Sequence, residues 1–222
     1  MNRILLAFTL AALATPAAAA DCPGNADALG TSRVLEIDPA KAAPAGRKQF
    51  PATLPLEKKE VVLTFDDGPV GGPTERVLAE GHTVGHHSYR HPLLSRMNPA
   101  RAEAEIDHGI AAVEAAVYGE PGGPPRTPFF RFPGFASSPA LLETMTKRGI
   151  AVFGADVWAG DWNRMSPERE QALVLKRLAA SGGGILLLHD TVPQTARMLP
   201  GLLRELKRRD YRIVHIVPKP AQ

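Results

Sequence analysis

Short apolar runs alternate with stretches of helical periodicity from residue 60 onward. The runs are rich in β-branched and aromatic residues and are bounded by turn residues, so we expect each to form a strand. They lie at residues 61–65, 82–85, 129–132, 150–154, 185–188 and 212–217. Strands that alternate with helices pair in parallel through helical crossovers. The pattern therefore predicts an α/β fold, either a (β/α) barrel or a doubly wound sheet.

Three of the intervening helices carry start signals. Asn98, Ser138 and Ser166 are each followed by proline, which places a capping side chain before a residue suited to the first helical position. The basic residues 207–209 are expected to end another helix. Residues 182–184 are three glycines that we interpret as a helix stop, because they lack the lysine and the spacing of a phosphate-binding loop.

The first twenty residues follow a different pattern. Arg3 gives a positive start, residues 4–13 are apolar, and three alanines at 18–20 offer a small-residue cleavage site. This layout predicts a secretory signal peptide over residues 1–20, which is too short for a membrane span; a buried N-terminal helix is the alternative. We therefore expect an exported protein, periplasmic or secreted, with no transmembrane segment.

Composition limits the domain count and the partners. The 222 residues, 44% hydrophobic and 22% charged, are enough for one domain with a substantial core. The Pro- and Ala-rich residues 21–58 are predicted to form a lead-in or cap with one β-like stretch at 31–37, and residues 59–222 the main domain. A net charge of +3 is too small to favour nucleic acid as a partner. Cys22 is the single cysteine and has no internal disulfide partner.

The first candidate chemistry is a pair of carboxylates. Asp66 and Asp67 directly follow the strand predicted at 61–65 and precede Gly68-Pro69. Active sites of α/β barrels lie at this end of the strands, where one carboxylate can bind a metal while the other acts as a base. A solvated turn is an equal alternative for this sequence taken alone.

Four of the seven histidines cluster within ten residues, at positions 82, 86, 87 and 91. A His-x-x-x-His spacing on a helical turn brings two imidazoles to one side, and two histidines with one carboxylate form a common catalytic zinc set. The spacing fits His82 with His86 and His87 with His91. We prefer the second pair, because His82 and His86 fall in or at the end of a predicted strand.

A third titratable group ends the apolar run at 185–188. His189, followed by Asp190, would point into the same mouth as the two aspartates and could serve as a general acid. The alternative is a capped strand end.

Together these segments resemble the polysaccharide deacetylase family, also called the NodB-homology family or carbohydrate esterase family 4. Five short motifs occur in the family's order over residues 61–190, and the ordered set is far more specific than any one of them. They are Thr64-Phe65-Asp66-Asp67-Gly68, His87-Ser88-Tyr89-Arg90-His91, Arg131-Phe132-Pro133, Asp161-Trp162 and Leu187-Leu188-His189.

The resemblance implies a distorted (β/α) barrel of the NodB type, with residues 59–222 as the catalytic domain. It implies a metal site formed by Asp67, His87 and His91, which would hold Zn²⁺, with Co²⁺, Ni²⁺ or iron left open.

The resemblance also implies catalytic roles. Asp66 would be the general base that takes a proton from the attacking water, and Arg131 would orient it. His189 would be the general acid that protonates the departing amine, and Asp161 would tune it.

Substrate contacts follow from the same motifs. Trp162 and Leu187 would line the pocket for the acetyl methyl group, and a backbone N–H after Pro133 would help to hold the oxyanion. Gly134 stands where the family usually has an aromatic residue, and Phe135 follows. We expect the backbone donor to be retained and the ring contact to be displaced. In the fourth motif Asp156 and Asp161 are five residues apart rather than three, so only Asp161-Trp162 is carried over.

The largest departure lies between the first two motifs. Asp67 and His87 are only 20 residues apart, where the family has a helix, a strand and another helix, a segment of roughly 30 residues or more. One internal strand–helix unit is therefore expected to be missing, leaving one short helix over residues 73–80. Because strands lie about 4.8 Å apart, the loss predicts either a gap in the sheet or a displaced strand, which could separate Asp67 from the two histidines.

Two functions follow. The first is metal-dependent removal of N-acetyl groups from an extracytoplasmic amino-sugar polysaccharide, either peptidoglycan or a chitin-like oligosaccharide, with O-acetyl ester hydrolysis as a nearby variant. The second is a catalytically impaired carbohydrate-binding relic of the same fold, motivated by the short connection.

Overall fold

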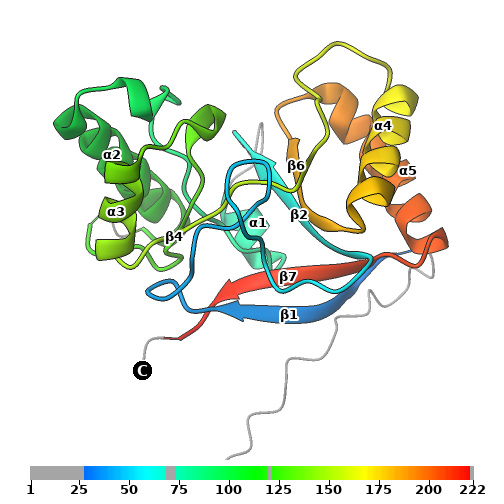
Figure 1. Ribbon diagram of the computed structural model, residues 1–222, viewed down its shortest axis with the longest axis horizontal. Coiled ribbons are helices and arrows are strands. Elements are labelled where there is room, and N and C mark those ends of the chain that lie inside the picture. The colour runs from blue at the N-terminus through cyan, green and yellow to red at the C-terminus, as the bar shows by residue number, and fades with distance from the viewer. Residues whose placement is uncertain (1–27, 69–73, 120–121, 221–222) are drawn as a thin grey trace, which may run out of the picture.

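The computed structural model describes residues 28–68, 74–119 and 122–220. The predicted signal peptide therefore lies outside the described residues. Two parallel sheets organise the chain, with helices on either side of them (Figure 1). The described strands and α-helices are, in chain order, β1 (Thr31–Ile37), β2 (Glu60–Asp66), α1 (Thr74–Ala79), α2 (Pro99–Tyr118), β3 (Phe129–Phe130), α3 (Pro139–Lys147), β4 (Ala151–Val152), β5 (Val157–Trp158), α4 (Pro167–Ser181), β6 (Gly184–His189), α5 (Pro193–Arg208) and β7 (Arg212–Pro218).

The larger sheet has the strand order β1-β7-β2-β6-β5, and the smaller one pairs β3 with β4. Every strand pair is parallel, as the alternating pattern predicts. Among the described residues the two sheets are not joined into a closed barrel. Isolated bridges of Ala45 with Phe153 and of His86 with Phe130 extend the smaller sheet.

The three predicted helix starts are confirmed by their caps. The side chains of Asn98, Ser138 and Ser166 accept hydrogen bonds from backbone N–H groups in the first turns of α2, α3 and α4, and proline follows each cap. Such bonds satisfy donors that have no partner within the helix. Of the basic residues expected at a helix end, Lys207 and Arg208 lie in the last turn of α5 and Arg209 is its C-cap.

Buried hydrophobic side chains form three clusters, one of which contains residues of both sheets, among them Val62 of β2 and Phe129 of β3. Of the other two clusters, one joins α4 and α5 to β2, β5 and β6, and the other joins α2 and α3 to β3 and β4. Figure 1 shows these helix pairs on opposite sides of the central strands. No helix among the described residues has the length and apolar character needed to cross a bilayer.

The Pro-rich lead-in is integrated into the fold. Its strand β1 pairs with β7 along most of its length. Asp156, directly before β5, accepts hydrogen bonds from Arg47 N at 2.9 Å, Thr53 Oγ1 at 2.6 Å and Ile185 N at 2.8 Å. The buried Asp156 carboxylate therefore ties the lead-in to the larger sheet.

The connection between the first two motifs contains one six-residue helix, α1, and no strand among its described residues. The strand predicted at 82–85 is wrong, since only His86 pairs, as a single bridge to Phe130. Thr83 Oγ1 instead lies 2.7 Å from Ile216 O and 2.8 Å from His215 Nε2 of β7. The segment after α1 thus contacts β7, which pairs with β2 only at the first two residues of β2.

Candidate functional site

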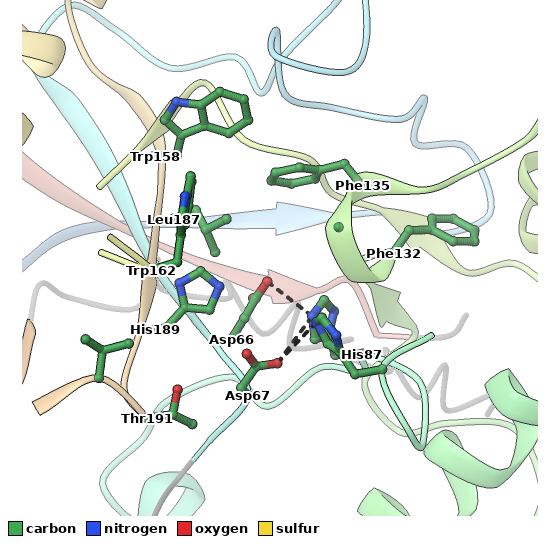
Figure 2. A pocket seen from close by; sticks show the side chains of 13 residues that line it. Asp66, Asp67, His87, Phe132, Phe135, Trp158, Trp162, Leu187, His189 and Thr191 are labelled. Atoms are coloured by element: carbon green, nitrogen blue, oxygen red, sulfur yellow. Dashed lines mark ion pairs between the residues drawn. The ribbon is translucent and has the colours of Figure 1, made fainter. Parts of the chain in front are cut away.

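The candidate site forms where β2 and β6 end side by side. Asp66 is the last residue of β2 and His189 the last of β6, and the two are register partners. Parallel strands bring their carboxyl ends to one edge of the sheet, which is where side chains after each strand converge. Figure 2 shows Asp66 and Asp67 directed toward the neighbouring His87, with His189 and Trp162 on the far side of the two aspartates.

Asp67, His87 and His91 form a cluster that can hold a metal ion. One ligand atom from each lies within 4.8 Å of the others. Asp67 Oδ1 is 3.6 Å from His87 Nε2 and 3.5 Å from His91 Nε2. Ligands at 2.0–2.2 Å from a tetrahedral zinc ion are about 3.4 Å apart. The donor types and spacing therefore fit such an ion.

Hydrogen bonding and burial prepare His87 for this role. Its Nδ1 lies 2.8 Å from the backbone oxygen of Arg131, so Nδ1 carries the proton and Nε2 presents a lone pair toward Asp67. Burial lowers the pKa of His87 below its ordinary value, against the opposing effect of the Asp66 carboxylate. A neutral imidazole oriented by a carbonyl is the form that ligates metals.

The backbone around the cluster is held in unusual conformations. Asp67 and His91 have φ values of 70° and 58°, and Ser88 has 66°. Non-glycine residues in this left-handed region cost of order 1–3 kcal/mol each and persist only where surrounding contacts fix them. Here Glu105 Oε2 of α2 accepts a hydrogen bond from Arg90 N at 3.0 Å. Gly109 of α2 packs so closely that a Cβ there would overlap the backbone of Ser88.

The short connection does not separate the three candidate ligands, which lie together although a displaced strand could have moved them apart. The expected helical turn is wrong, because His87 and His91 lie in a loop. The alternative pair lies elsewhere: His82 is exposed and His86 is buried, with its Nε2 3.7 Å from Glu114 Oε1. The pair preferred from sequence spacing is the one that converges with Asp67 in a candidate cluster, and the loop backbone rather than a helical turn aligns the two imidazoles.

Asp66 is paired with a buried arginine. Arg131, only 7% exposed, donates from Nη1 to Asp66 Oδ1 at 2.7 Å and from Nη2 to Gly154 O at 2.9 Å. This fixes the carboxylate and leaves Oδ2 on the pocket side, 3.5 Å from His87 Nε2. The arrangement matches a carboxylate held in place to accept a proton.

His189 is held by Asp161 on the opposite wall. Its Nδ1 lies 2.9 Å from Asp161 Oδ1, and its backbone N–H donates to Asp161 Oδ2 at 2.6 Å. Burial alone would lower the pKa of His189, but the bond to Asp161 and the charges of Asp161, Asp66 and Asp67 outweigh it and raise the pKa above its ordinary value. The raised pKa favours the imidazolium form, which suits a proton donor.

These groups open onto a single cavity of about 440 Å³. The predicted pocket residues Trp162, Leu187, Gly134 and Phe135 line it, while Arg131 and Asp161 stand behind the lining residues. The full lining is Asp66, Asp67, His87, His91, Phe132, Gly134, Phe135, Trp158, Trp162, Leu187, His189, Thr191 and Val192.

Sequence reasoning missed Trp158. Its ring is 5.9 Å from those of Phe135 and Trp162, which makes an aromatic wall at one end of the cavity (Figure 2). Strand β5 is only two residues long, so no apolar run marked it. The register of Trp158 with the predicted pocket residue Leu187 is the feature that places it.

Comparisons with known proteins identify relatives of this chain. Residues 72–153 match the family model described as polysaccharide deacetylase. A chitooligosaccharide deacetylase of Bradyrhizobium sp. (strain ANU 289) is 34% identical over 205 residues, covering 72% of this chain and 90% of the relative. The alignment is 205 positions long, but 72% of this 222-residue chain is only about 160 residues. The relative therefore has residues without a counterpart in this chain.

Two further relatives are more distant. The peptidoglycan-N-acetylglucosamine deacetylase PgdA of Listeria monocytogenes serotype 1/2a (strain 10403S) is 28% identical over 190 residues, covering 71% of this chain and 38% of that protein. The structure of the Bdellovibrio bacteriovorus peptidoglycan deacetylase Bd3279 superimposes with a TM-score of 0.74 and 26% identity, covering 92% of this chain and 64% of that one. The chain thus spans less than two thirds of both these relatives.

Proposed function

Because the chain belongs to the polysaccharide deacetylase family, we propose that it is a metal-dependent hydrolase that removes N-acetyl groups from an amino-sugar polysaccharide. Peptidoglycan and chitin-like oligosaccharides are the proposed substrates, in line with the names of the relatives. The observation that carries the proposal is the convergence of Asp67, His87 and His91 beside Asp66, opposite His189, in one cavity.

The metal would be held by Asp67, His87 and His91, and zinc suits this set of two nitrogens and one oxygen. When bound, it would polarise the acetyl carbonyl and lower the pKa of a water molecule. Cobalt, nickel or iron could be held by the same donors.

The chain's own residues account for the proton transfers. Asp66 Oδ2 takes a proton from the water whose oxygen attacks the acetyl carbonyl carbon. His189, as imidazolium, gives a proton to the amide nitrogen as the carbon–nitrogen bond breaks, so acetate and a free amine leave. Arg131 and Asp161 hold the base and the acid in place, which supports proton transfer by fixed groups.

Substrate positioning falls to the remaining lining residues. Trp162 and Leu187 would enclose the acetyl methyl group. Of the two N–H groups after Pro133, that of Phe135 already donates to Phe132 O at 2.9 Å, so Gly134 N–H is the remaining donor for the developing oxyanion. Such a fixed donor stabilises charge that appears only in the transition state.

The setting of the reaction belongs to the same proposal. Residues 1–20 would direct export, residues 21–58 would form the lead-in and residues 59–222 the catalytic domain. A glycan outside the cytoplasm would then be within reach. N-terminal sequencing of protein recovered from the periplasm or medium should begin at Asp21; protein retained in the cytoplasm with Met1 intact would contradict the export.

Acetate release from an N-acetylated oligosaccharide is the direct test of function. The chain should release acetate after loading with zinc, lose this activity with a chelator, and regain it when zinc returns. His87→Ala should be inactive under all three conditions. If the parent and His87→Ala bind the oligosaccharide equally and neither releases acetate, the carbohydrate-binding relic becomes the better account.

A further inference from the structure

A fully buried carboxyl group lies behind the proposed acid. Glu170, in the first turn of α4, has 0% exposure. Its Oε1 is 3.0 Å from Thr195 Oγ1 of α5, and its Oε2 has no hydrogen-bond partner among the described residues. A buried ionised carboxylate is costly unless a cation pairs with it, and among the described residues no ion pair joins Glu170 to one. Its burial therefore calls for an explanation.

The Thr195 hydroxyl connects Glu170 to Asp161. Thr195 Oγ1 lies 3.1 Å from Asp161 Oδ2 as well as 3.0 Å from Glu170 Oε1. A hydroxyl has one hydrogen to donate and lone pairs to accept. If that hydrogen goes to the Asp161 carboxylate, Glu170 must supply a hydrogen of its own to remain bonded to Thr195.

The charges around Glu170 favour this neutral form. Burial raises the pKa of Glu170 above its ordinary value, and the nearby Asp161 carboxylate adds to the rise, against the opposing bond from Thr195. The resulting order of donors runs from the Glu170 carboxylic acid to the Thr195 hydroxyl and on to Asp161. Asp161 accepts at its other oxygen from His189 Nδ1.

We propose that Glu170 is a positioning residue for His189, and that as a neutral acid it acts through Thr195 and Asp161. The role rests on the proposed function, in which His189 is the proton donor. A neutral Glu170 fixes the Asp161 carboxylate without adding a second negative charge behind it. His189 then responds to Asp161, with Asp66 and Asp67 as the other charged groups that face it.

Four variants separate this role from a purely structural one. Glu170→Gln keeps the shape, the neutral charge and a donor, so we expect kcat, KM and the alkaline limb of the pH profile to match the parent. Glu170→Ala and Thr195→Val each break the connection, so kcat should fall on the order of tenfold with KM nearly unchanged, the loss of about one hydrogen bond to a charged group. The double variant Glu170→Ala/Thr195→Val should lose no more than Thr195→Val alone, because Glu170 acts only through that hydroxyl.

The control is Glu168→Gln, the same change at an exposed position of the same helix, which should leave every parameter unchanged. If Glu170 were ionised, Glu170→Gln would remove a negative charge and move the alkaline limb to lower pH; that result would overturn the proposal. Additive losses in the double variant, or an unchanged kcat in Thr195→Val, would overturn it as well.

A readout that needs no turnover keeps the two proposals distinguishable. The His189 ring proton on Nδ1 can be followed by NMR, and its exchange with solvent should be faster in Glu170→Ala and Thr195→Val than in the parent and Glu170→Gln. Faster exchange in a chain that releases no acetate would support the positioning role while the proposed function fails. Equal exchange in all four proteins would overturn the positioning role itself.

Discussion

The two walls of the cavity are built in different ways. The wall with Asp67, His87 and His91 consists of loops, with two of the three residues in left-handed backbone conformations and His91 half-exposed. The wall with His189 consists of β6 backed by α4 and α5, where Asp161, Glu170 and Thr195 are all buried. The first wall, which we call the loop wall, therefore depends on strained backbone. The second, which we call the acid wall, depends on a packed core with internal hydrogen bonds.

This difference shows how the chain can have a short connection between the first two motifs and still align a candidate metal site. The acid wall lies on strands and helices outside that connection. The loop wall is held in place by contacts from α2, through Gly109 and Glu105, and by the bond of His87 to Arg131 O. We therefore expect substitutions in the loops that carry the candidate metal ligands to have the largest effects on the site.

The largest expected effect comes from His87→Ala on the loop wall. Two donors cannot hold zinc as three do, so we expect metal binding and acetate release both to be lost. His82→Ala is the matched control, because His82 belongs to the alternative pair and is exposed. Metal affinity is measured by competition with a chelator. Normal affinity in His87→Ala, or a loss of affinity in His82→Ala, would contradict the assignment of His87 and His91 and favour His82 and His86 as ligands.

On the acid wall, we expect Asp161→Asn to have the next largest effect on activity. The bond to Asp161 raises the pKa of His189, so the proton-donating form prevails below that raised pKa and is lost as pH rises through it. An asparagine removes the charge, so kcat should fall by about 10²- to 10³-fold and the alkaline limb should move to lower pH. An alkaline limb that stays in place would show that His189 is not the acid.

The same substitution has a signature in stability. Because the folded-state pKa of His189 is raised, its ion pair stabilises the folded chain at pH values below the unfolded-state pKa, and this contribution disappears as pH rises through the folded-state pKa. The gap in unfolding free energy between parent and Asp161→Asn should therefore be larger at pH 5.5 than at pH 9, as measured by denaturant titration.

Gly109→Ala tests whether α2 sets the loop wall. Helix propensity alone predicts that alanine in mid-helix stabilises by up to about 1 kcal/mol. The added Cβ would instead overlap the backbone of Ser88, so we expect a lower melting temperature and about a tenfold loss of metal affinity. Ala112→Gly, at an exposed position of α2, should lower helix stability alone and leave metal affinity unchanged. A stabilised Gly109→Ala with normal metal affinity would contradict the contact.

The smallest effect is expected for Trp158→Ala at the aromatic end of the cavity. Its ring packs against Phe135 and Trp162, so KM should rise by about fivefold with little change in kcat, as for the loss of one aromatic contact. Steady-state kinetics with an N-acetylated oligosaccharide measures both parameters. A fall in kcat alone would place Trp158 among the residues that act in the transition state.

Sequence patterns predicted what depends on local signals. Helix starts at Asn98, Ser138 and Ser166 follow from capping chemistry, and β2 and β6 from their apolar runs. The strand predicted at 82–85 was wrong because contacts with β7 and β3 determine the path of that segment. The β-type residues of the segment do not by themselves show which strand it lies against.

The candidate site was predictable to a similar extent. Residues with rare chemistry at recognisable spacing, such as Asp67, His87 and His91, were identified from sequence. Thr195, Glu170 and Trp158 were not, because a common residue gains its role only through packing of distant segments: α4 against α5 for the first two, β5 against β6 for the third. No periodicity or short motif reports such contacts.

The central claim is that the loop wall assembles a metal site despite the short connection. The most direct measurement is elemental analysis of zinc bound per chain, after reloading the purified protein and removing free metal. The account predicts about one zinc per chain, and Asp67→Asn should greatly reduce that occupancy. No stoichiometric zinc in the unmodified chain, with cobalt and nickel equally absent after reloading, would contradict it.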